Sequence, residues 1–68
     1  MTLDTFNQLY EDILQLRLSR NQKDMQFAQL MSMMERTFKI PMLINVRWEA
    51  EHNEVISLYR KISFSRSL

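Results

Sequence analysis

The chain has 68 residues, 46% of them apolar and 25% charged, and nine Lys and Arg against eight Asp and Glu leave a net charge of +1. This length predicts a single domain, residues 1–68, with a small core, and the absence of Cys excludes disulfides and thiolate zinc sites. The nearly balanced charge is not the strongly basic footprint of a typical nucleic-acid-binding domain.

The absence of Gly and the single Pro indicate the fold class. Tight hairpin turns need residues with positive φ, which Gly supplies, whereas helices use Gly only at some of their C-termini. We therefore predict an all-α fold, a small bundle of two to three helices spanning about residues 4–19, 22–38 and 42–63.

The first predicted helix, residues 4–19, follows a possible N-terminal cap at Thr2 or Asp4. Its apolar residues recur at helical spacing along one stripe, which comprises Phe6, Leu9, Tyr10, Ile13 and Leu16.

The second predicted helix, residues 22–38, holds four of the six methionines. Phe27, Leu30, Met31, Met34 and Phe38 share one face, so we interpret it as the central core helix. Met-rich surfaces also adapt to several partner shapes, which leaves a partner groove as the alternative.

The polar stretch 19–24 separates the two helices, and we favour a turn there. A continuous helix over residues 3–38 is the alternative, because the heptad phase is kept through Arg20 and Lys23 and neither Gly nor Pro interrupts it.

Pro41 predicts that the second helix ends near Phe38 or Lys39, since proline disfavours helical geometry in the residue before it. For the third helix, residues 42–63, two alternatives stay open: an extended run over 42–48, or a helix that starts at Asn53. The serine-rich end predicts a frayed tail from about residue 64.

Enzymatic activity is not expected, because the chain has one His, no Cys and no Gly-rich phosphate loop. We predict no catalytic residues, no cofactor and no metal. The longest apolar run, 41–44, is too short to span a bilayer. The N-terminus is acidic and amphipathic, unlike a signal peptide, so we expect a cytoplasmic protein.

Self-association is the expected function, because a core this small is often completed by oligomerisation. We predict a non-enzymatic protein–protein interaction module that forms a homodimer or binds a helix of another protein. The predicted self-association seam comprises Phe6, Leu9, Ile13, Phe27, Leu30, Met31 and Met34. Trp48, Tyr59 and Arg60 are the predicted partner-binding residues, since these residue types dominate interface hot spots.

Two alternatives belong to other classes. A small nucleic-acid-binding regulator of helix-turn-helix type would use the basic residues Arg17, Arg20 and Lys23, but the Met-rich helix is too apolar for a recognition helix. A metal-bridged helical dimer would use the spacing of Glu49 and His52, which di-iron bundles share. That site would also need an inward acid in each chain, for which the candidates are Glu11 and Glu35.

Overall fold

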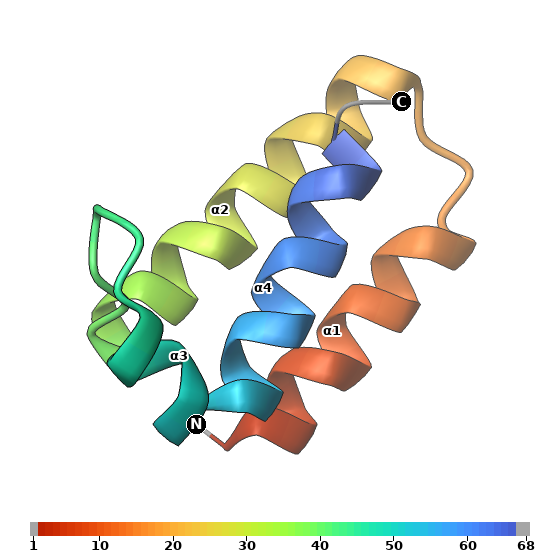
Figure 1. Cartoon of the computed structure of the whole chain (residues 1–68). Helices are drawn as coiled ribbons and strands as arrows, with labels where there is room; N and C mark the ends of the chain where they lie inside the picture. Colours follow the sequence, from red (N-terminus) through yellow and green to blue (C-terminus); the bar gives the residue numbers. More distant parts are fainter. Residues whose placement is uncertain (1, 67–68) are drawn as a thin grey trace.

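A computed structural model describes residues 2–66 and shows an all-α chain, with no strand in that range (Figure 1). The helices are α1 (Leu3–Gln15), α2 (Arg20–Phe38), α3 (Val46–Glu51) and α4 (Asn53–Arg66). The predicted fold class, a small helical bundle, is confirmed, with one helix more than the two to three expected.

The three longer helices lie side by side, and α2 runs antiparallel to α1 and α4 (Figure 1). The main packing contacts join α2 to α4 and α2 to α1, so α2 is the central helix, as its Met-rich face predicted. The short α3 packs against α4, and the loop between α2 and α3 projects from one end of the bundle (Figure 1).

The core is one apolar cluster formed by all three long helices. Its fully buried side chains are Phe6 of α1, Met34 of α2 and Ile62 of α4, one from each helix. Aromatic rings join the helices, because Phe6 lies 5.4 Å from Phe38 and Tyr10 lies 5.6 Å from Phe27 between ring centroids. Pairs at this separation add stabilisation beyond the apolar area that they bury.

The predicted turn between the first two helices is present, but α1 ends at Gln15, four residues earlier than expected. The reason is a capping box at the start of α2. The Ser19 hydroxyl accepts a hydrogen bond from the Gln22 N–H, and the Gln22 side chain accepts one from the Ser19 N–H. The Lys23 Nζ also donates to the Leu14 carbonyl at 3.1 Å, which satisfies a free acceptor at the end of α1.

The end of α2 agrees with the prediction, since the helix stops at Phe38 and Lys39 is its C-cap. Lys39 has φ 56° and ψ 50°, the left-handed conformation that usually favours Gly. Its N–H and that of Ile40 donate to the Glu35 carbonyl. A chain without Gly therefore ends its central helix with a lysine in a conformation that costs a Cβ-bearing residue about 1 kcal/mol or more.

The predicted single helix over 42–63 is wrong, because residues 40–45 form a loop and the helical part divides into α3 and α4. After Pro41, the first side chain used as a cap is that of Asn45, whose Oδ1 accepts from the Trp48 N–H at 2.9 Å. The break follows at His52, which lies outside helical geometry while its N–H donates to the Trp48 carbonyl. The start of α4 at Asn53 agrees with the alternative left open above.

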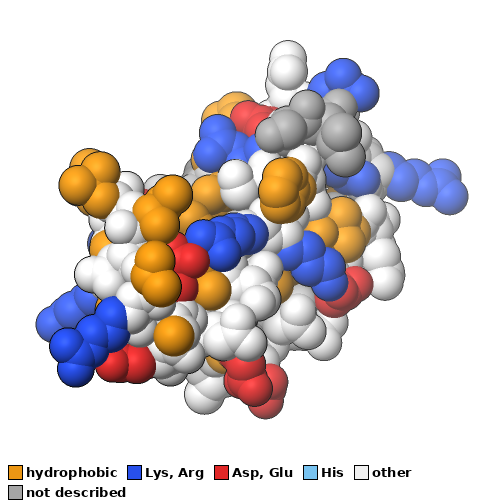
Figure 2. Space-filling view, viewed as in Figure 1, with side chains coloured by type: hydrophobic (Ala, Val, Ile, Leu, Met, Phe, Trp, Pro, Cys, Tyr) orange, Lys and Arg blue, Asp and Glu red, His pale blue; other side chains and the backbone are white. Residues whose placement is uncertain are grey.

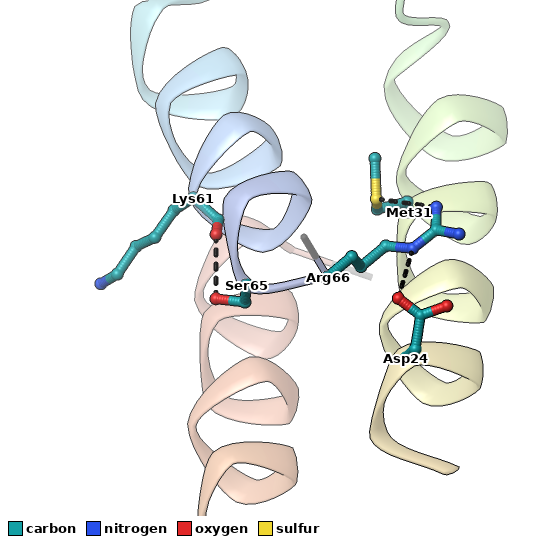
Figure 3. Close-up of polar contacts among 5 residues, drawn as sticks. All are labelled: Asp24, Met31, Lys61, Ser65 and Arg66. Atoms are coloured by element: carbon teal, nitrogen blue, oxygen red, sulfur yellow. Dashed lines mark hydrogen bonds and ion pairs between the residues drawn. The ribbon is translucent and has the colours of Figure 1, made fainter. Parts of the chain in front are cut away.

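The predicted frayed tail is wrong for residues 64–66, which belong to α4, while 67 and 68 lie outside the described residues. Long-range contacts hold this last turn. The Ser65 hydroxyl hydrogen-bonds the Tyr10 hydroxyl at 2.7 Å and donates to the Lys61 carbonyl. The Arg66 guanidinium reaches across to α2, where Nε lies 3.3 Å from Asp24 and a terminal nitrogen approaches the Met31 sulfur (Figure 3).

Candidate interaction surface

The loop between α2 and α3 exposes four large apolar side chains close together in the sequence. Met42 is 102% exposed, Leu43 84%, Ile44 83% and Val46, the first residue of α3, 79%. Hydrophobic side chains gather over this projecting end of the molecule in the space-filling view (Figure 2). We use the name apolar loop for residues 41–46, which are the end of this loop together with the first residue of α3. Exposed contiguous apolar patches are uncommon on monomeric proteins and mark interaction sites.

A groove of about 470 Å³ lies between the apolar loop and the bundle. We call it the loop groove. Residues of the loop form one wall and residues of α4 form the other, with contributions from α2 and α3. Its lining comprises Glu35, Ile40, Pro41, Met42, Leu43, Ile44, Glu49, Ile56, Tyr59, Arg60 and Ser63.

Polar side chains tie the helices together around the loop groove. The Tyr59 hydroxyl of α4 donates a hydrogen bond to Glu35 of α2, and the Arg60 guanidinium forms an ion pair with Glu49 of α3. Partial burial and, next, the bond to Glu35 raise the pKa of Tyr59 from 10.0 to about 12. The groove therefore combines apolar walls with fixed polar groups of both signs.

The three predicted partner-binding residues do not lie together. Tyr59 and Arg60 both line the loop groove, and Arg60 keeps 51% of its side chain exposed. Trp48 is partly buried, packs against the core and stacks on His52 with ring centroids 4.3 Å apart. Tyr59 and Arg60 therefore lie beside the apolar loop, whereas Trp48 packs α3 against the bundle.

The predicted self-association seam lies inside a single chain. Six of its seven residues are buried in the core and the seventh, Leu9, is partly buried against it. A second copy would reach these side chains only if the bundle opened. The seam prediction stays untested, since a single chain is described; in the closed bundle Leu9 is the seam residue that keeps partial exposure.

The residues considered for a metal bridge have other partners. The carboxylate of Glu49 pairs with Arg60, and the Nδ1 atom of His52 lies 2.9 Å from the Trp48 carbonyl oxygen. Among residues 2–66, no group of three or more His, Asp or Glu side chains is arranged to hold a metal ion.

The basic residues considered for nucleic acid lie at the opposite end of the bundle from the apolar loop. Arg20 and Lys23 border a shallow hollow together with Arg66 and Asp24. Two of the cations are engaged within the protein, Lys23 by the Leu14 carbonyl and Arg66 by Asp24. Three cations therefore face one carboxylate, Asp24, around this hollow.

Sequence reasoning placed Met42, Leu43 and Ile44 in a helix over residues 42–63, so it missed the exposed patch. A signal was present, because three apolar residues stand between Pro41, which disfavours helical geometry before it, and Asn45, a good N-cap residue. Apolar residues confined between two such positions belong to a loop, where few neighbours can cover them.

The chain matches no protein-family model, no curated protein and no solved structure. None of the helices within residues 2–66 has the length and apolar character needed to cross a membrane.

Proposed function

We propose that this chain is a non-enzymatic helical interaction module that self-associates through the apolar loop and the loop groove. The observation that carries the proposal is the near-complete exposure of Met42, Leu43 and Ile44 beside a groove of about 470 Å³.

Burial of the apolar loop supplies the driving force. Apolar surface removed from water contributes about 25 cal/mol per Å², and a fully buried Met, Leu or Ile side chain contributes about 1.5–3 kcal/mol. Three such side chains adjacent in sequence form one compact apolar anchor. Their position next to a recess gives this anchor a defined place to bind.

A second copy is the partner that the surface fits best. Two copies related by a two-fold axis present the same patch to each other, so the patch has to complement itself. Each copy offers a projecting apolar loop and an adjacent groove. The groove also carries both charge signs, acidic Glu35 and Glu49 together with half-exposed Arg60. Within each copy Glu49 is paired with Arg60 and Glu35 accepts from Tyr59, so a second copy would meet an apolar centre bordered by polar groups that already have partners.

This proposal relocates self-association from the predicted seam to the loop groove and leaves the bundle closed. The core residues then stabilise each subunit, and the exposed residues join the two subunits. Substitutions in the apolar loop are therefore expected to weaken dimerisation without lowering the stability of the subunit.

The test compares two serine variants by sedimentation and light scattering over a concentration series. The variant Met42→Ser, Leu43→Ser, Ile44→Ser is expected to be monomeric at concentrations where the native chain is dimeric. Phe64→Ser is the matched control, because Phe64 is 71% exposed and does not line the groove. It should associate as the native chain does. A native chain that stays monomeric at every concentration contradicts the proposal, as does equal loss in both variants.

A second comparison separates groove residues from packing residues. Arg60→Ala should weaken association about tenfold, in the range of a moderate hot spot, with little change in unfolding. Trp48→Ala should instead lower the thermal midpoint, because Trp48 packs against the core. The reverse pattern, in which Trp48→Ala abolishes association and keeps its stability, would place the partner surface on α3.

A further inference from the structure

The methionines of this chain differ sharply in their exposure to water. Met34 and Met31 are 0% and 8% exposed in the core, Met25 on the outside of α2 is 63% exposed, and Met42 in the apolar loop is 102% exposed. With no Cys present, methionine is the residue type whose sulfur can be reversibly oxidised. A small oxidant therefore meets Met42 before it meets the methionines that hold the bundle together.

We infer that Met42 is a reversible oxidation site that regulates self-association, an inference that rests on the function proposed above. In the step itself, the thioether sulfur attacks one oxygen of hydrogen peroxide. The S–O bond forms as the O–O bond breaks, the sulfur is oxidised by two electrons, and the peroxide is reduced to water. A methionine sulfoxide reductase returns the thioether at the expense of two thiols, which become a disulfide as water is released.

Because of its position, oxidation of Met42 is expected to weaken dimerisation. Met42 lines the loop groove and lies next to Leu43 and Ile44 in the anchor. Sulfoxide is polar and accepts strong hydrogen bonds, so its burial between two subunits would cost free energy where the thioether gains it. Met42 occupies a loop, and its side chain makes no part of the buried core. Oxidation there therefore changes the surface and leaves the fold intact.

The methionines of the core are protected from the same oxidant. Met34 is fully buried, and Met31 is 8% exposed with its sulfur approached by the Arg66 guanidinium of α4. Both sulfurs are therefore shielded from a dissolved oxidant while the bundle stays closed. At mild peroxide concentrations the protein should therefore respond at its surface first, as a folded molecule.

The experiment treats the native chain with a low concentration of hydrogen peroxide and follows two readouts. Peptide mass spectrometry gives the order in which the methionines are oxidised, and sedimentation gives the dimer dissociation constant. Met42 should be oxidised first among the methionines of residues 2–66. The dissociation constant should rise about tenfold or more, the value expected when one buried methionine side chain is lost from the interface. Reductase with dithiothreitol should restore it.

Two leucine variants provide matched controls. Met42→Leu keeps an apolar side chain but has no thioether, so its dissociation constant, measured before and after peroxide, should not change with the treatment. Met25→Leu removes an exposed methionine outside the groove and should stay as sensitive as the native chain. Circular dichroism checks that oxidised samples keep their helices.

The possible failures are distinguishable. A native chain that never dimerises in reducing buffer overturns the proposed function and this inference with it. A chain that dimerises, but whose dissociation constant is unchanged once Met42 is fully oxidised, overturns the inference alone. A peroxide response that Met42→Leu retains, or a mass spectrum in which Met42 is oxidised after Met31 or Met34, also overturns it.

Discussion

Two regions of this molecule use the same residue types with opposite outcomes. The central helix places Met31 and Met34 in the core, whereas the apolar loop leaves Met42 fully exposed and Leu43 and Ile44 nearly so. Neither hydrophobicity nor helix propensity separates the two sets. The difference lies in the backbone conformation, which is helical around one set and a loop around the other.

In α2, helical spacing stacks side chains three and four residues apart on one face, where α1 and α4 cover them. In the loop, Lys39 turns the chain away from the helix axis, and the first cap follows only at Asn45. The apolar residues between them have no regular face and no second element over them. An apolar residue is thus buried or exposed according to the helix boundaries around it.

The comparison is tested most directly with phenylalanine, which occurs at a buried position, Phe6, and at an exposed position, Phe64. Phe6 is 0% exposed, and Phe6→Ala should lower the free energy of unfolding by about 3–5 kcal/mol, as deletion of a buried aromatic ring does. A small core supplies little more than this in total, so the variant should be largely unfolded by circular dichroism.

Phe64→Ala is the matched control, because Phe64 lies on α4 but is 71% exposed. Its free energy of unfolding, measured in urea, should change by no more than a surface substitution does, about 0.5 kcal/mol. Equal destabilisation of the two variants would mean that the bundle is packed differently from the arrangement in Figure 1.

The N-caps of α2 and α3 allow the same comparison between a core helix and a peripheral one. Ser19→Ala removes the capping box that separates α1 from α2, and it should cost about 1 kcal/mol of stability by urea unfolding. Asn45→Ala removes the cap of α3, which contributes no fully buried side chain, so the urea midpoint should move less. A larger effect at Asn45 would show that α3 is part of the cooperative core.

Periodicity in the sequence was sufficient to predict the bundle. The spacing of Phe27, Leu30 and Met34 identified the buried face of α2, and Pro41 located its end. The break near residue 19 was predicted with less precision, because the stripe through Leu16 continues the helical pattern. The capping box at Ser19 starts a new helix there, since its two reciprocal hydrogen bonds satisfy N–H groups that lack backbone acceptors at the first turn of a separate helix.

Part of the candidate site could not be predicted in the same way. Tyr59 and Arg60 were selected by residue type, and both line the loop groove. The loop itself was assigned to a helix, because Ile44 and Trp48 have helical spacing and no Gly marks a turn. Only the tertiary arrangement shows that the chain reverses there through a lysine in the left-handed conformation.

Lys39 marks the boundary between the two regions, and its substitution tests that boundary. Lys39→Gly relieves the Cβ strain of the left-handed conformation, about 1–2 kcal/mol, but adds backbone freedom to the unfolded chain, about 0.5–1 kcal/mol. A net gain of about 0.5–1 kcal/mol should appear as a higher urea midpoint. Lys39→Ala, which keeps the Cβ atom, should show no such gain. Destabilisation by glycine would mean that α2 continues past Phe38.

The smallest effect is confined to alkaline pH and comes from Tyr59, which links α4 to α2 beside the groove. Burial and the bond to Glu35 raise its pKa to about 12 in the folded chain, from 10.0. Between these values the unfolded chain releases the phenol proton while the folded chain keeps it, so stability falls as pH rises. The stability contributed by Tyr59 is complete below about pH 10 and lost as pH passes 12.

Tyr59→Phe removes this titration, so the difference in unfolding free energy between native chain and variant should shrink over that interval. Glu35→Gln should lower the pKa of Tyr59 only part of the way to 10.0, because burial is the larger cause and remains. Tyrosinate absorbance, read as native chain minus Tyr59→Phe, measures both effects. A Tyr59 that titrates near 10.0 in the folded protein would mean that the contact between α2 and α4 is open at the groove, where the apolar loop begins.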